Sequence, residues 1–167
     1  MPRFDVDLSR VSRNHYITGK AAINFCWPDT TTGGWHRTAY WDKEAGQVKV
    51  SLAGIHFPDT TAYLDDAGIV DAGPELRRRG WKVEREIFIA DHFRATADMV
   101  IAWSNSTAPR CNVELNDWFP EDQDFCRIVE LLTAVTARLD SLPRQRLGGW
   151  LEEQLRLSMC PRTPGTL

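Results

Sequence analysis

Two six-residue segments within the first 61 residues share one pattern: a thiol or polar residue, an aromatic residue, and then Pro-Asp-Thr-Thr. Residues 26–31 read CWPDTT and residues 56–61 read HFPDTT. Each copy places an aspartate directly after a proline, and the first copy also carries a thiol, Cys26. An aspartate that orients a histidine can make that histidine a general base, and a nearby thiol can then act as a nucleophile. The repeat is therefore the first place to look for chemistry.

The catalytic interpretation of the repeat has four candidate residues. His36 would be the base, Asp29 or Asp59 would orient it, and Cys26 is the possible nucleophile. This set predicts a small hydrolase or transferase. It requires no cofactor, and the sequence contains no Walker loop, no GxGxxG and no HExxH motif.

The second interpretation is that the repeat forms a binding surface. It would gather the aromatic side chains of Trp27, Trp35 and Phe57 with the imidazole of His56. The chain has seven tryptophans in 167 residues. Because tryptophan is seldom fully buried and is over-represented at interfaces, this content favours a protein partner.

An ordinary structural role also accounts for the repeat. Proline ends a strand, and the aspartate and threonine side chains that follow it commonly bond nearby backbone N–H groups. Alternation along the predicted strands places His36 and His56 on opposite faces of the sheet, so a metal bridging them is not expected. The repeat is thus expected mainly to end strands and stabilise turns, and only secondarily to form a functional site.

Period-two alternation predicts three strands at the start of the chain. They are expected over residues 15–27, 35–42 and 47–57. In this antiparallel meander Trp41 would lie beside Val48, and the two copies of the repeat would share one rim of the sheet. The proposed location for function depends on that geometry.

The rest of the chain predicts mainly helices. They are expected near residues 60–67, 74–80, 91–104, 121–140 and 147–159, with strands over 81–90 and 111–115. Asp91 should cap one helix with His92 facing solvent, and the apolar run Ile87-Phe88-Ile89 indicates an interior strand. The order predicts an α+β fold: an antiparallel sheet beginning with an N-terminal three-stranded meander, helices packed on one face, and two C-terminal helices. Residues 1–160 are expected to form a single domain and residues 161–167 a disordered tail.

Composition limits the function classes. Lys plus Arg number 20 against 23 for Asp plus Glu, so the formal net charge is −3. This disfavours a nucleic-acid binder with a broad basic surface, and Arg77-Arg78-Arg79 is the only basic run. The sequence shows no apolar stretch able to cross a bilayer and no signal core, so a cytoplasmic location is expected.

Two hypotheses follow. The first is a non-catalytic protein-binding or regulatory module of a cytosolic system, contacting its partner through the Trp35 rim. The alternative is the small hydrolase or transferase built on His36, Asp29, Asp59 and Cys26. Neither includes a cofactor, a metal, a nucleic acid or a membrane, and neither specifies an oligomeric state.

Overall fold

The computed structural model describes residues 3–4, 8–28, 30–32, 38–42 and 47–159. Three of the candidate residues, Asp29, Trp35 and His36, lie outside this part of the chain, and so does the predicted tail at 161–167.

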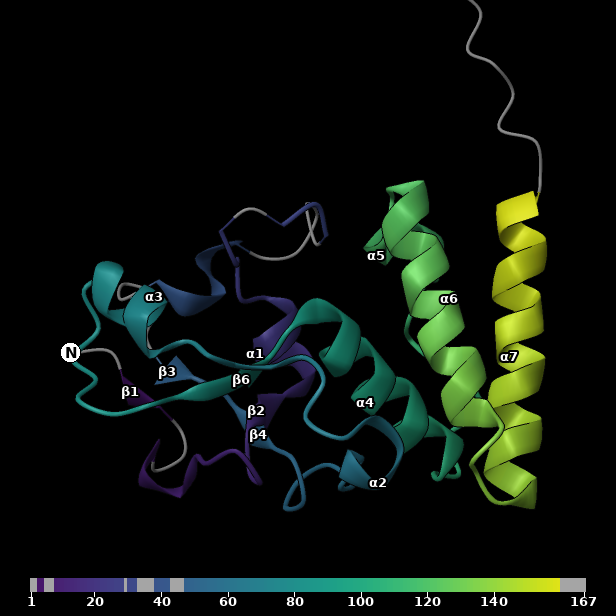
Figure 1. Ribbon diagram of the computed structural model, residues 1–167, viewed down its shortest axis with the longest axis horizontal. Helices are drawn as coiled ribbons and strands as arrows, with labels where there is room; N and C mark the ends of the chain where they lie inside the picture. The colour runs from purple at the N-terminus through teal and green to yellow at the C-terminus, as the bar shows by residue number, and fades with distance from the viewer. Residues whose placement is uncertain (1–2, 5–7, 29, 33–37, 43–46, 160–167) are drawn as a thin grey trace, which may run out of the picture.

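A four-stranded mixed sheet forms one side of the described fold (Figure 1). Its strands, in spatial order, are β4 (Ser51–Leu52), β2 (Ile17–Thr18), β6 (Phe88–Ala90) and β5 (Ile69–Asp71). β2 runs antiparallel to β4 and parallel to β6, and β5 is antiparallel to β6. A separate parallel pair joins β1 (Arg3–Phe4) to β3 (Gln47–Val48). The fold is therefore α+β with a partly parallel sheet.

The predicted antiparallel three-stranded meander is wrong. The first predicted strand stops after Thr18, since Gly19 adopts φ +66° and opens helix α1 (Gly19–Ile23). Residues 38–41 of the second form a 3-10 turn. The third is divided, because β3 pairs with β1 whereas β4 pairs with β2.

Burial explains why alternation misled at α1. A half-buried strand over this segment would expose Ala22 with Lys20, on the polar face. Instead Ala21, Ala22 and Ile23 are all buried, and α1 packs against helix α4. Two adjacent alanines are good helix formers that allow close helix packing, so the helix is favoured here.

The other helices follow the predicted order more closely. They are α2 (Thr61–Leu64), α3 (Gly73–Arg78), α4 (His92–Ser104), α5 (Leu115–Trp118), α6 (Asp122–Thr136) and α7 (Ser141–Met159). α7 begins earlier than predicted and includes Pro143 in its first turn. Proline is tolerated there because backbone N–H groups of the first turn have no partner within the helix. The predicted strand at 111–115 is absent, and its last residue starts α5. The interior position of Phe88 and Ile89 is confirmed, because β6 lies between β2 and β5.

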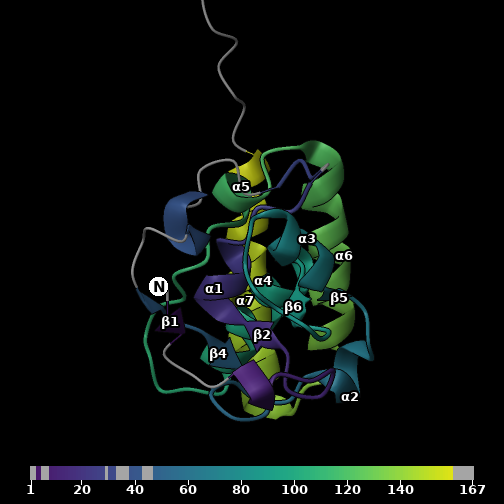
Figure 2. The ribbon, with the colours of Figure 1, turned by 90° about the vertical axis from the view of Figure 1, so that its left-hand side faces the viewer.

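Helix α4 occupies the middle of the molecule. It contacts α1, β2 and β6 on one side and α6 and α7 on the other, so the sheet and the two C-terminal helices form outer layers around it (Figures 1 and 2). Residues 92–98 are buried without interruption. A helix buried on all sides must supply partners for its own polar side chains. No helix among the described residues is both long enough and apolar enough to span a bilayer.

Candidate functional site

Threonines from both repeat regions bind polar side chains of α4. Thr32, just after the first copy, has its Oγ1 2.5 Å from His92 Nδ1. Thr60, inside the second copy, donates from Oγ1 to Asp98 Oδ1 at 2.5 Å. Since α4 rises 1.5 Å per residue, these two anchor points are about 9 Å apart along its axis. Both regions of the repeat therefore fasten loops to the central helix.

The tautomer of His92 follows from its two neighbours. Nε2 lies 2.9 Å from the Phe25 carbonyl oxygen, which can only accept, so Nε2 carries the proton. Nδ1 is then an acceptor, and the Thr32 hydroxyl donates to it. Burial lowers the pKa of His92 below its ordinary value, which keeps the imidazole neutral. The prediction that His92 faces solvent is wrong, because only 4% of it is exposed.

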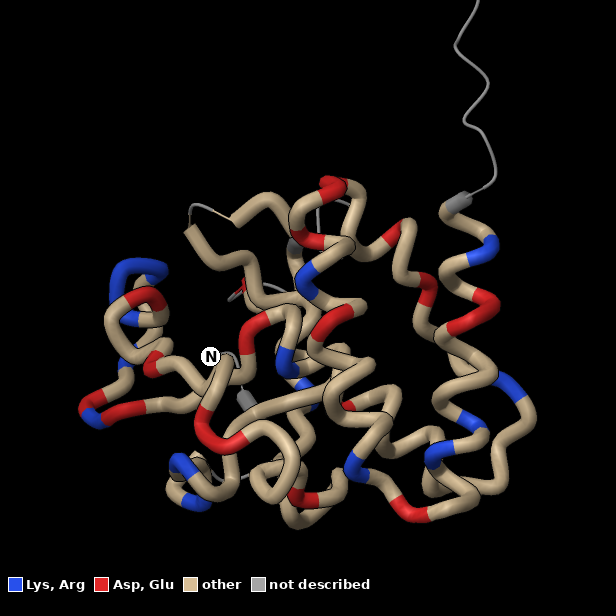
Figure 3. Tube along the Cα trace, turned by 45° about the vertical axis from the view of Figure 1, so that its right-hand side comes forward, with Lys and Arg blue, Asp and Glu red and all other residues tan. Residues whose placement is uncertain are grey.

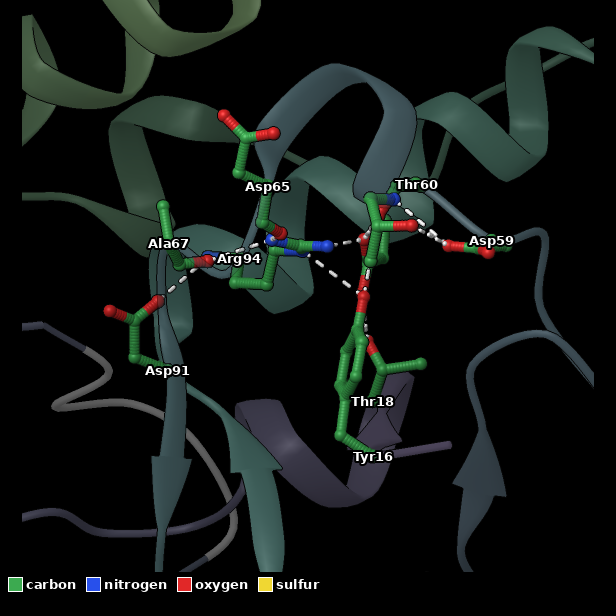
Figure 4. Close-up of polar contacts among 10 residues, drawn as sticks. Tyr16, Thr18, Asp59, Thr60, Asp65, Ala67, Asp91 and Arg94 are labelled. Atoms are coloured by element: carbon green, nitrogen blue, oxygen red, sulfur yellow. Dashed lines mark hydrogen bonds and ion pairs between the residues drawn. The ribbon is translucent and has the colours of Figure 1, made fainter. Parts of the chain in front are cut away.

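Asp98 is the centre of a buried polar network. Figure 4 shows three other members of it, Tyr16, Thr60 and Arg94, pointing toward one another. Asp98 accepts from Tyr16 Oη at 2.8 Å, from Thr18 Oγ1 at 2.7 Å and from Thr60 as above. Arg94 Nε lies 3.3 Å from Asp98 Oδ1 and donates to Tyr16 Oη at 3.0 Å. The network joins the residues around β2, the second copy of the repeat and α4.

Most of this network is internally paired, which points to a structural role, and among its buried side-chain atoms only Arg94 Nη2 lacks a hydrogen-bond partner within the described structure. Burial raises the pKa of the Asp98 carboxyl, and the hydroxyl donors together with Arg94 oppose that rise. Burial and the negative charge of Asp98 raise the pKa of Tyr16, so its hydroxyl remains a donor. Arg94 Nη1 donates at 2.8 Å to the carbonyl oxygens of Asp65 and Ala67. Buried charges of this kind are tolerated only when surrounded by such partners.

A hollow of about 310 Å³ lies beside the first copy of the repeat. We call it the α4–α6 hollow. It is lined by Trp27, Thr30, Thr31, Thr32, Val70, Asp91, His92, Phe93, Asp124 and Arg127. Because α4 begins at residue 92 and α6 at residue 122, the hollow sits at the N-terminal ends of both helices.

The acidic groups of the hollow are already engaged. Asp91 Oδ1 accepts the backbone N–H of Arg94 at 2.8 Å and so caps α4. Burial raises the pKa of this carboxyl. Asp124 accepts from the Thr31 hydroxyl, which ties the first copy of the repeat to α6.

The two hydrogen-bond donors of the hollow, on Arg127 and Trp27, differ in their exposure to solvent. The Arg127 guanidinium lies 4.1 Å above the ring centroid of Phe93, and the Arg127 residue is exposed. Trp27 packs edge-on against Phe25, with ring centroids 4.5 Å apart. The Trp27 indole Nε1 is shielded from solvent, and no hydrogen-bond acceptor reaches it within the described structure. A shielded N–H without an acceptor costs about 1–3 kcal/mol.

The described candidate catalytic residues have other partners. Asp59 is exposed and accepts from Thr61 N at 2.9 Å and Thr61 Oγ1 at 2.6 Å, which lower its pKa. Cys26 is half-buried, and its carbonyl oxygen accepts from Arg79. Asp29 and His36 are outside the described residues. Asp59 thus performs the turn-bonding role that the sequence favoured.

The described candidate binding residues are at separate positions. Trp27 follows the end of α1 and lines the α4–α6 hollow. The Phe57 ring covers the start of α1, where a Cβ on Gly19 would come within 2.9 Å of it. His56 is exposed and accepts the Leu52 N–H at Nδ1 (2.9 Å). Among these, only Trp27 belongs to the hollow.

Most of the tryptophans form part of the core. Of the six whose positions are described, four are buried: Trp41, Trp81, Trp118 and Trp150. Trp81 Nε1 donates to the Trp41 carbonyl oxygen at 3.1 Å, and Trp41 Nε1 donates to that of Ala21 at 2.8 Å. The tryptophan content is therefore largely a packing feature.

The single basic run is only partly neutralised, because one carboxylate serves two of its three arginines. Arg78 and Arg79 both pair with Glu75, at 2.6 Å and 2.8 Å, and hydrogen bonding from Arg78 lowers the Glu75 pKa to about 2. Figure 3 shows basic and acidic residues interspersed along the chain. Within the described ranges no cluster of three or more His, Cys, Asp or Glu could hold a metal ion.

The sequence offered only an indirect signal for the hollow. Ala95 and Ala97 next to Phe93 are typical of a helix buried on several sides, which would have placed His92 inside. Nothing local links Arg127 to Trp27, which lies 100 positions earlier. The chain matches no family model, no curated protein and no solved structure.

Proposed function

We propose that the protein is a non-catalytic protein-binding module and that the α4–α6 hollow receives its partner. The observation that carries this proposal is the indole N–H of Trp27, a residue that lines the hollow. This N–H is shielded and has no acceptor among the described residues. An acceptor supplied by a partner would remove that cost.

The remaining chemistry of the hollow indicates the kind of partner group. Asp91 and Asp124 already accept bonds, whereas Arg127 is exposed above Phe93 and donates a hydrogen bond to none of the described residues. The positive N-terminal ends of α4 and α6 are already met by Asp91 and by Asp122 and Asp124 in the first turn of α6. These features favour a neutral acceptor such as a backbone carbonyl oxygen on the partner, because it can accept from both an indole and a guanidinium without adding a third negative charge beside Asp91 and Asp124. Val70, 39% exposed at the edge, offers apolar contact beside it.

The test is capture of a partner from native lysate by three variants. Trp27→Phe removes the N–H and keeps an aromatic ring, and Arg127→Ala removes the guanidinium. Trp27→Phe should weaken capture about threefold to tenfold and Arg127→Ala about tenfold or more, the effects of losing a neutral and a charge-assisted hydrogen bond. Arg156→Ala changes an exposed arginine on α7 and should leave capture unchanged.

Circular dichroism of each variant provides the folding control. Folded Trp27→Phe and Arg127→Ala proteins that capture the partner as well as the parent chain would refute the assignment of this hollow.

A further inference from the structure

A second hollow of about 450 Å³ lies between α7 and the segment that follows α4. Two tryptophans form its aromatic part: Trp103 in the last turn of α4 and Trp150 in α7, with ring centroids 6.4 Å apart and planes at 51°. Trp103 is held in place because its Nε1 donates to the Ala108 carbonyl oxygen at 3.1 Å. Leu157, 54% exposed, extends the apolar wall. None of these residues lines the α4–α6 hollow.

The charged groups of this second hollow are mainly acidic. Glu114 and Glu153 line it together with Arg110, so the lining carries two negative charges and one positive charge. Both glutamates are exposed, and neither forms an ion pair with any described residue. A positively charged guest is therefore complementary to the hollow.

The protein already stacks a guanidinium on one member of this pair, Trp103. Arg146 lies 4.6 Å from the ring centroid of Trp103 and donates to the carbonyl oxygens of Ser106 and Ala108. A guanidinium is planar, stacks on an aromatic ring and binds a carboxylate through two parallel N–H bonds. An ammonium has the charge but not the planar fork.

We propose that the Trp103–Trp150 hollow binds an arginine side chain of a protein partner. The guanidinium stacks against the part of the Trp103 ring that remains exposed and pairs with Glu153 or Glu114, while its methylene stem lies along Leu157. This second contact uses residues separate from those of the proposed function, so each can fail without the other.

The test uses the full-length protein and three capped tripeptides, Gly-X-Gly, with X arginine, lysine or citrulline. Citrulline has nearly the shape of arginine but no charge. Two-dimensional NMR follows the indole N–H signals of Trp103 and Trp150, assigned from the variants Trp103→Phe and Trp150→Phe. The arginine peptide should shift these signals at millimolar concentration and the citrulline peptide should not.

Three variants distinguish the site from general charge attraction. Glu153→Gln should weaken binding of the arginine peptide about threefold, as expected for a partly exposed ion pair. Glu152→Gln is the matched control, because Glu152 is exposed on the same helix and does not line the hollow, and it should have no effect. Arg110→Ala removes the opposing charge and should tighten binding.

Equal signal shifts with the lysine or citrulline peptide would overturn the proposal. So would equal losses in Glu153→Gln and Glu152→Gln, or weaker binding in Arg110→Ala.

Discussion

His92 connects three segments that are distant in sequence. It begins α4, accepts from Thr32 at the wall of the α4–α6 hollow, and donates to the carbonyl oxygen of Phe25. Both contacts require the neutral imidazole, because a protonated Nδ1 could no longer accept from Thr32. A single titratable side chain thus holds the wall of the proposed binding surface.

This position predicts a pH-dependent stability. Folding lowers the pKa of His92. As the pH falls through about 6.5, this histidine is therefore protonated in the unfolded chain while it is still neutral in the folded chain. Stability should therefore be full above about pH 6.5 and fall as the pH drops below it, by at most about 1.4 kcal/mol per pH unit.

Urea unfolding at pH 7.5 and pH 5.5 measures this effect, with His92→Gln as the comparison. Glutamine can accept and donate at this position but does not titrate, so the variant should lose less stability between the two pH values. An identical loss in both proteins would mean that His92 does not cause the pH dependence.

At the scale of elements, α4 is the part of the fold on which the other elements depend. The Asp98 carboxylate accepts hydrogen bonds from Tyr16, Thr18 and Thr60. Helix α1 packs against the same helix, α4. Each of these hydroxyls removes part of the cost of burying a charge.

Adjacent threonines of the second copy provide a matched test of this role. Thr60 is fully buried and donates to Asp98, whereas Thr61 Oγ1 donates to the exposed Asp59. Thr60→Val should lower the free energy of unfolding by about 1–3 kcal/mol, because a buried carboxylate loses a donor. Thr61→Val should change it by less than about 1 kcal/mol. Similar losses in chemical denaturation would contradict the importance of the network.

At the scale of the whole molecule, some features were predictable from local signals. The cap at Asp91 and the long helices α4, α6 and α7 follow from turn chemistry and helical spacing of apolar residues. The continuous apolar run at Phe88 and Ile89 correctly indicated an interior strand.

Other features depended on distant contacts. β5 (Ile69–Asp71) is only three residues long and carries a half-exposed Val70, so alternation gives it no clear pattern. The change from strand to helix at Gly19 reflects packing of α1 on α4, a contact between residues about 75 positions apart. The α4–α6 hollow arises from four separate segments and has no local signature.

The most direct test of the central claim is photo-crosslinking from the α4–α6 hollow. A photoreactive phenylalanine analogue placed at Val70, on the edge of the hollow, should form a covalent adduct with the partner in living cells, and Arg127→Ala in the same chain should lower the yield of that adduct about tenfold. The same analogue at Glu152, on the exposed surface of α7, should form no such adduct. An adduct of equal yield at both positions, or one at Val70 whose yield Arg127→Ala leaves unchanged, would contradict the assignment of this hollow as the partner-binding surface.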